Sequence, residues 1–568
     1  MKDRIFATRR CLGGKISRVS VALLLVLAMM LGVCSCGTKS FSTPEEQFKY
    51  VEAEQINSGI DKLAESFDTL REEASPENKS ANATLRLELG DDVLDLVNEA
   101  LGMDVSFVND LILSFAGNSS DDATEIDVGL KLAKNAIASL NVIADMEGEK
   151  LYVSIPEFVE KTLALDFESI GIDADAIEET LNSTAALEQL PDGDQLAKVL
   201  KKYVDIILDN LGSAQKTDAV LKAGGYEEEC TAITVEISPV TMADIMLDLI
   251  PAAAQDKELE ALIADFDRAL SDMDAYLYLT DEWDSFKEQA DELVKDIEDS
   301  YDQLDTDTVI TWTDYVNKKS EIIGRLIKLE DVGDTYEFFY GTAFDGNEFG
   351  FELYFDDTYE KVLIEGEGTE KKNVVNASYE ISYQNEVYLT LDVSDVNQDK
   401  LEDGYLNGTF ELYPSRALMD MLGLTDDSVT SLFGSAFSLK LVADVLEDDA
   451  DITLSIMAGK AALLSVNIAA QNTKSASIKL PTDKNVETDP EAWAADLTVD
   501  DVQTKLVETG VPAEIVALIV GMGGASDYGY GYDYDYDYGY DYDYDYDYDY
   551  DYDYDYDYDY DYDYDYDY

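Results

Sequence analysis

Alternation of apolar and polar residues at every second position, over many consecutive segments, constrains the fold of this chain most strongly. A strand with one buried face repeats every two residues, whereas a helix repeats about every 3.6. Turns as short as Lys134-Asn135 and Asp345-Gly346-Asn347-Glu348 join these segments. Such turns connect antiparallel neighbours, because parallel strands need a crossover of about a dozen residues or more. The sequence therefore predicts antiparallel meanders.

Two β-rich regions are predicted from this alternation. The first contains strands at 83–89, 109–116, 123–133, 136–145 and 150–155, and later one at Thr231–Ile237. The second contains strands at 309–316, 320–329, 335–344, 349–355, 361–367, 374–383, 386–393, 405–413, 436–445, 450–457, 462–470 and 475–480. Apolar spacings of three and four residues predict helices at 43–70, 93–101, 195–211, 241–264, 282–301 and 418–422, and a last helical part from Asp489 to about Val520.

The two β-rich regions share an order of elements. Ala83-Thr84 lies about 325 positions before Gly408-Thr409, and a helix, two strands, a tight turn and two further strands follow each of them. Ser139–Val142 and Ser465–Ile468 are equivalent segments at nearly the same offset. A constant offset indicates an internal duplication. The alternative is that alternating strands resemble one another by chance.

These patterns predict an α+β fold with antiparallel curved β-sheets in two similar lobes, packed helices and a disordered C-terminal tail. The predicted segments are a signal peptide (1–35), a tether and N-terminal helix (36–82), a first β-lobe with helices (83–250), a helical connector (251–305), a second β-lobe (306–482), C-terminal helices (483–522) and the tail (523–568).

The N-terminus has the order of a bacterial secretion signal. Basic residues precede the apolar run Val21–Val33, and Cys34-Ser35-Cys36 follows it. About 13 apolar residues are too few for the ~20 of a membrane-spanning helix. The cysteines make the segment similar to a lipoprotein signal, and the small Ser35 favours lipidation of Cys36. Cys34, which follows the branched Val33, is the alternative acceptor, and an unlipidated signal peptide is the other alternative.

Composition narrows the function further. Removal of residues 1–35 takes away six of the 40 basic residues and one of the 122 acidic residues, which leaves a formal charge of −87. A chain with this much negative charge repels phosphate backbones. We therefore expect no nucleic-acid partner. The chain has no histidine, which excludes Ser-His-Asp and Cys-His catalysis and histidine-ligated zinc. We therefore expect no enzyme activity and no cofactor.

An aromatic hairpin is the first candidate site. Strands 335–344 and 349–355 place aromatic residues on one shared face, which is either the wall of a cleft for an apolar or glycan ligand or a sheet face packed on helices. The ligand-cleft candidates are Tyr336, Phe338, Tyr340, Phe344, Phe349, Phe351 and Phe355.

A second candidate is a cation site. Asp395, Asn397 and Asp399 have the oxygen spacing of a calcium loop. However, Lys400 stands where such loops need Gly, and Leu406 stands where they need a bidentate Glu. The alternative is a solvated loop.

The C-terminal segment is a low-complexity repeat. Every even position from Tyr528 to Tyr568 is Tyr, and the odd positions hold Asp, apart from three Gly. Like charges at this density predict an extended, disordered segment. Divalent cations are the partners that such a segment would collect, and weakly.

The lipoprotein signal, the helix that starts at Thr43-Pro44-Glu45-Glu46, the meander that ends in Tyr152–Pro156 and a second β-lobe together resemble large uncharacterised lipoproteins of Gram-positive bacteria. More remotely, the pattern is similar to the curved-sheet folds of lipoprotein carriers, which implies a fold and no site residues.

From these features we expect a lipid-anchored protein on the outer face of the cytoplasmic membrane, with the tail pointing outward. We expect it to bind an apolar or glycan ligand of unknown identity. The alternative is a structural or adhesive surface protein whose acidic, Tyr-rich tail collects cations or contacts the envelope. A hydrolase that works with carboxylates alone is a third interpretation.

Overall fold

The computed structural model describes residues 41–73, 79–120, 123–171, 190–272, 278–304, 309–331, 334–357, 359–423, 437–474, 477–495, 497–513 and 515–517. All of these residues lie in one unit, Met1–Ala517. The predicted signal segment with Cys34 and Cys36, and the Asp-Tyr tail, lie outside the described residues.

Twenty strands of the described residues form a single curved, unclosed sheet. The strands are β1 (Lys79–Leu89), β2 (Leu111–Ser119), β3 (Ala123–Leu132), β4 (Asn135–Asp145), β5 (Lys150–Ser154), β6 (Thr162–Asp166), β7 (Ala214–Ala223), β8 (Tyr226–Ile237), β9 (Val309–Val316), β10 (Ile322–Asp331), β11 (Asp334–Asp345), β12 (Glu348–Asp356), β13 (Lys361–Lys371), β14 (Val374–Tyr383), β15 (Glu386–Asn397), β16 (Asn407–Pro414), β17 (Phe437–Val445), β18 (Asp449–Ala458), β19 (Ala461–Lys474) and β20 (Val486–Glu487).

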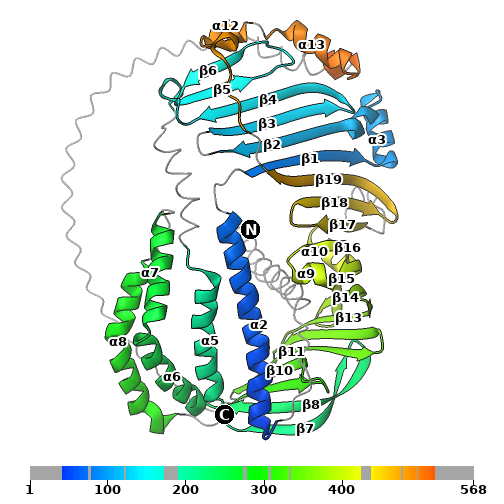
Figure 1. Ribbon diagram of the computed structural model, residues 1–568. Helices are drawn as coiled ribbons and strands as arrows, with labels where there is room; N and C mark the ends of the chain where they lie inside the picture. Colours follow the sequence, from blue (N-terminus) through cyan, green and yellow to red (C-terminus); the bar gives the residue numbers. More distant parts are fainter. Residues whose placement is uncertain are drawn as a thin grey trace, which may run out of the picture. The chain divides into compact units, whose positions relative to one another are not determined.

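The order of strands in the sheet departs from chain order at two places, where β19 pairs with β1 and where β6 pairs with β20. A meander runs from β7 to β19, and β19 then pairs with β1, from which the meander continues to β6 (Figure 1). These pairings are antiparallel, and the short β20 adds to β6 in parallel. The two β-rich regions predicted from the sequence are therefore parts of one sheet.

Helices precede, interrupt and follow the strands. They are α2 (Pro44–Glu73), α3 (Asp91–Leu101), α5 (Gly193–Asp209), α6 (Pro239–Ala254), α7 (Lys257–Asp272), α8 (Leu279–Ser300), α9 (Gln398–Glu402), α10 (Arg416–Met421), α12 (Pro490–Ala494) and α13 (Val499–Glu508). Single 3-10 turns lie at Ser106–Asp110, Phe167–Ile170, Tyr301–Gln303 and Asp483–Asn485. None of the helices in the described part of the chain is long and apolar enough to span a membrane.

Three helices cover one face of the sheet at β8 and β9. Phe48 and Val51 of α2 pack with Leu208 of α5 and Ile245 of α6 against Ile233, in a shared buried core. Helix α2 begins where the sequence predicts, because the Thr43 hydroxyl accepts a hydrogen bond from the Glu46 amide at 3.2 Å. Helices α2, α5 and α6 thus share one core with β8 and β9.

The hairpin of β7 and β8 turns onto the opposite face of the sheet. Its Gly224 has φ +50°, and a Cβ there would lie 2.1 Å from the Gly366 carbonyl oxygen of β13. A Cβ on Gly350 of β12 would likewise lie 2.0 Å from the Ala223 oxygen. Because only glycine lets backbones approach so closely, these residues allow Leu221 and Cys230 to pack against Phe339 of β11.

The α+β class with a curved antiparallel sheet is confirmed, but several local predictions were wrong. The predicted helix 241–264 is two helices, because the Asp256 carboxylate accepts the Glu258 amide at 2.9 Å and starts α7. Strands β6, β7 and β20 and the short helix α9 were not predicted. Residues 477–480, predicted as part of a strand, have no regular structure.

The predicted internal repeat has a clear structural counterpart. The unit β1-α3-β2-β3-β4 recurs as β16-α10-β17-β18-β19, and the two four-strand units are neighbours in the sheet. The residue before each helix makes the same bond to the preceding strand of the sheet: the Gly90 amide donates to Leu463 O at 2.9 Å, and the Ser415 amide donates to Tyr388 O at 2.8 Å. These shared details support a duplication over chance resemblance.

Candidate functional site

A continuous apolar surface runs across both repeat units. Directly paired residues of antiparallel strands lie on the same face of a sheet. One such row crosses eight strands through Gly408, Ala443, Ile452, Ile468, Leu85, Leu113, Leu130 and Ala138. A parallel row contains Val445, Ala450, Ala470, Ala83, Phe115, Val128 and Leu140. We call this side of β16–β19 and β1–β4 the apolar face.

The apolar face is partly open to solvent. Six of its large side chains are 37–51% exposed, three in each repeat unit: Leu439, Leu454, Ile468, Phe115, Ile126 and Leu140. Neither row contains a charged residue. Apolar patches of this extent mark binding sites more often than free surface. The apolar face is therefore the strongest candidate site for a ligand without charge.

The opposite face of the same strands is polar. Thr453 donates a hydrogen bond to Asn467 at 2.8 Å, and at the equivalent place in the other unit Asn141 donates to Asp127 at 2.8 Å. Ser455 and Ser465 also pair across β18 and β19 at 2.8 Å. The sheet thus separates a polar side from an aliphatic side in both units.

The predicted aromatic hairpin does share one face. Phe338 pairs with Phe355, Tyr340 with Leu353, and Phe344 with Phe349 across β11 and β12. This face continues through Leu353 and Ile364 toward the apolar face. The structure therefore brings the ligand-cleft candidates together as the alternation predicted.

The two ends of the aromatic hairpin differ in burial. Phe349 is 6% exposed and belongs to a core cluster with Ile364 and Tyr379, against which Phe344 and Phe351 pack. Burial in this cluster raises the pKa of Tyr379 to about 12. Tyr336 and Phe355, in contrast, are 39% and 46% exposed. Only the second end remains available to a ligand.

A buried ionic network joins α2 to the sheet. Arg325 of β10 donates from Nε to Asp314 Oδ1 at 2.9 Å and from Nη2 to the Glu52 carboxylate of α2. Its guanidinium lies 4.9 Å from the ring centroid of Trp312. Gln55 of α2 donates to the Tyr340 hydroxyl at 3.4 Å. This is the densest group of buried charged side chains in the part of the chain described above.

The network has two carboxyl groups, Glu52 and Asp314, for one guanidinium, Arg325. This imbalance shifts the pKa values of its members. Burial raises the pKa of Glu52 to about 9, helped by a hydrogen bond and the negative charge of Asp314. Burial alone would lower the pKa of Arg325, but the charges of Asp314, Tyr340 and Glu52 outweigh it and raise that pKa. These surroundings favour the charged form of Arg325 and the uncharged form of Glu52.

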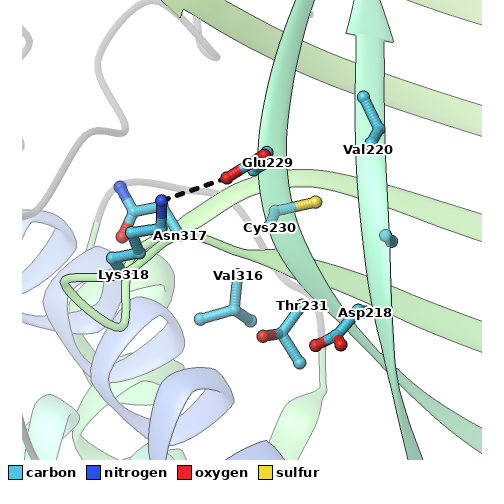
Figure 2. Close-up of a pocket in the computed structure, with 9 residues that line it drawn as sticks. Asp218, Val220, Glu229, Cys230, Thr231, Val316, Asn317 and Lys318 are labelled. Carbon is cyan, nitrogen blue, oxygen red and sulfur yellow. Dashed lines mark hydrogen bonds and ion pairs between the residues drawn. The ribbon is translucent and has the colours of Figure 1, made fainter.

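Two surface pockets lie outside the ionic network. One of about 510 Å³ lies among β7, β8 and β9, beside the exposed Glu229–Lys318 ion pair (Figure 2). The other, of about 310 Å³, is lined by β1, β18 and β19 and includes Ala83, Ala450 and Ala470 of the apolar face. None of the aromatic candidates lines either pocket. Cys230 borders the first pocket as a free, buried thiol, and burial raises its pKa, which disfavours the reactive thiolate.

The calcium candidates lie at a strand end and a helix start. Asn397 ends β15 and caps α9, where its side chain accepts the Lys400 amide at 3.3 Å. Asp399 accepts a hydrogen bond from Asn373 at 2.8 Å, and Asp395 is exposed. Among the residues with described positions, no group of three or more His, Cys, Asp or Glu could hold a metal ion.

Sequence reasoning missed the ionic network and the extent of the apolar face. Asp314 and Arg325 are in phase with the apolar residues Trp312 and Ile327 of their strands, and charged residues at inward positions were the available signal. The pairing of β19 with β1, which joins the two apolar halves, had no signal in the sequence.

No family model, curated protein or solved structure matches this chain.

Proposed function

We propose that this chain is a lipid-anchored, extracytoplasmic, non-enzymatic protein that binds the acyl chains of a lipid on its apolar face. The observation that carries the proposal is the open, uncharged surface across eight strands. Burial of such a surface contributes about 25 cal/mol per Å². An acyl chain is the ligand class that gains this energy and leaves no polar group unsatisfied.

A glycan fits this surface less well. Sugar recognition needs hydrogen-bonding side chains next to an aromatic ring. The two rows of the apolar face consist of aliphatic residues, Gly and one Phe. Exposed rings occur further along the sheet at Tyr336 and Phe355, where they can extend an apolar binding surface.

The duplication suggests how many acyl chains the apolar face binds. Each repeat unit contributes three exposed apolar side chains to the apolar face. We therefore expect a ligand with two acyl chains, one on each unit. The predicted lipidation of Cys36 would keep the protein beside the membrane that contains such lipids.

The direct test is lipid analysis of the full chain purified from its membrane. Native mass spectrometry should detect a co-purifying diacyl lipid, and a fluorescent fatty acid should bind and be displaced by phospholipid. A protein free of lipid that does not bind the probe would refute the acyl-binding proposal.

Variants can place the ligand on the apolar face. Leu454→Glu puts a charge on that face at a position 49% exposed, and we expect at least a tenfold loss of probe affinity. Val442→Glu is the matched control, because Val442 is 40% exposed but pairs with Thr453 on the polar side. Equal effects of both variants would remove the apolar face as the site.

The alternative is a structural or adhesive surface protein whose tail is the working part. The regular Asp-Tyr sequence of 527–568 supports it, since dense carboxylates collect Ca²⁺ weakly. Removal of the tail should then abolish cell-surface attachment while lipid binding is unchanged. Unaltered attachment without the tail would contradict this alternative.

A further inference from the structure

Helix α2 is fixed to the sheet by an unusual balance of buried charge. Glu52 and Asp314 are both 0% exposed, and the Arg325 side chain between them is 15% exposed. Two carboxylates therefore share one guanidinium. Full ionisation of all three groups would leave one negative charge uncompensated in the interior, which is strongly unfavourable.

The hydrogen bonds show where the balance is restored. Glu52 Oε1 and Asp314 Oδ1 each accept from Arg325, and Asp314 Oδ1 also accepts from Trp312 Nε1 at 3.1 Å. The second oxygen of each carboxylate, Glu52 Oε2 and Asp314 Oδ2, is buried without a donor from any described group. A buried acceptor without a donor destabilises the folded state. A proton shared by the two carboxyl groups would satisfy both oxygens.

We infer that Glu52 and Asp314 hold one proton between them, and that this proton locks helix α2 onto the sheet at neutral pH. Glu52 is the protonated partner, because Asp314 already accepts two hydrogen bonds from charged or polar donors. The lock bridges residues that are far apart in the chain, and it lies in the helix that follows the predicted lipidated tether.

The groups that face the pair come from each element packed around it. Helix α2 contributes Gln55, β9 contributes Trp312, β10 contributes Arg325, and β11 contributes the Tyr340 hydroxyl. Strand β8 presents the apolar Ile233 opposite Asp314. Lys216 of β7 lies in the same row as Ile233 and Asp314, but it is exposed and donates to Gln47 of α2 at 2.7 Å. Arg325 is therefore the cation that contacts the pair, and it already serves both carboxylates. A proton is therefore the remaining means of neutralising the pair.

The inference predicts a specific pH dependence. The folded chain keeps a proton on Glu52 up to a pH of about 9, whereas the unfolded chain loses it near pH 4.5. The unfolded state binds fewer protons in this window, so stability falls as pH rises. One proton changes the unfolding equilibrium constant about tenfold per pH unit.

Glu52→Gln in the full chain is the decisive variant, because an amide can donate to Asp314 without a titrating proton. In the wild type, the proton on Glu52 should raise the unfolding equilibrium constant about tenfold for each unit of pH increase. The variant should lack this tenfold contribution. At neutral pH the wild type should release about one more proton on unfolding than the variant, as measured by calorimetry in buffers of different ionisation enthalpy. Glu65→Gln, at an exposed position of the same helix, is the control and should behave as the wild type.

A second variant and a spectroscopic readout exclude a purely structural explanation. Asp314→Asn should also remove the extra proton, because its amide can donate to an ionised Glu52. In the infrared spectrum, the folded wild type at neutral pH should show a protonated-carboxyl band that both variants lack. Equal proton release by wild type and variants, or the absence of that band from the wild type, would overturn the inference.

Discussion

Arg325 is the residue on which the docking of α2 depends. It bonds two buried carboxylates and lies over the Trp312 ring. Arg325→Met would leave Glu52 and Asp314 without their cation, and we expect a loss of about 3–5 kcal/mol of unfolding free energy. The same change in a Glu52→Gln background should cost about as much at neutral pH, because Glu52 is already neutral in the wild type. Denaturant unfolding of the four chains measures this coupling, and a much smaller loss in the Glu52→Gln background would contradict a neutral Glu52.

Space around single glycines gives a second prediction at this scale. A Cβ on Gly90 would lie 1.9 Å from the Ala462 carbonyl oxygen of β19, whereas a Cβ on Gly59 of α2 has no atom within 4 Å. Gly90→Ala should therefore destabilise the chain by about 3 kcal/mol. Gly59→Ala should stabilise it by about 0.5–1 kcal/mol, since it removes backbone entropy from a helix interior. Thermal unfolding should show a lower melting temperature for Gly90→Ala and a higher one for Gly59→Ala. Shifts in the same direction would be inconsistent with this packing.

Among the elements, the junction of α6 and α7 depends on Asp256. Its carboxylate accepts from Lys202 at 2.7 Å, from Tyr203 at 2.8 Å and from the Glu258 amide. Burial would raise the pKa of Asp256, but these hydrogen bonds outweigh it and lower the pKa to about 2. The folded state thus favours the ionised form, so this stabilisation is present above pH 3.8 and is lost as pH falls toward 2.

Asp256→Ala should remove both the helix start and this acid dependence. We expect a loss of about 2 kcal/mol at neutral pH and a flatter stability profile between pH 3.8 and 2. Denaturant midpoints across this range provide the measurement. Asp265→Ala, in the middle of α7, is a control whose profile should match the wild type.

Strands and their pairing were predicted well because their signal is local. The alternation and short turns from β9 to β15 place each strand next to the following one, and the structure has this order. The single helix predicted at 241–264 was wrong because the Asp256 carboxylate accepts the Glu258 and Leu259 amides and starts a new helix, α7, an effect of side-chain geometry. Strand β7 was missed because Gln215–Asp218 is polar and exposed, which gives no alternation to recognise.

The candidate site was predicted only in part. The common face of the aromatic hairpin follows from period-two alternation, and β11 and β12 have it. The burial of Phe349 beneath neighbouring strands, and the openness of Leu454 and Ile126, depend on which elements cover the sheet. Such tertiary contacts join residues hundreds of positions apart, and no single stretch of sequence contains them.

For the whole molecule, the membrane anchor is the first property to test. We predict that Cys36→Ala abolishes membrane retention and that Cys34→Ala leaves it unchanged, because Ser35 fits the position before the acylated cysteine. Fractionation of cells and mass spectrometry of the N-terminal peptide measure both effects. Retention of the Cys36→Ala chain would refute the assignment of the anchor.

The pairing of β1 with β19 also determines how this chain can reach its folded state. Leu85 and Ile468, which are neighbours in the sheet, lie at opposite ends of the described sequence. Contacts between residues so distant in sequence slow folding, because a long loop must close before they form. A chain exported from its N-terminus would present the edge of β1 unpaired until most of the remaining polypeptide has crossed the membrane. During that interval the edge can pair with a second chain. If the chain is exported as we propose, we predict that its export depends on factors that keep nascent chains apart.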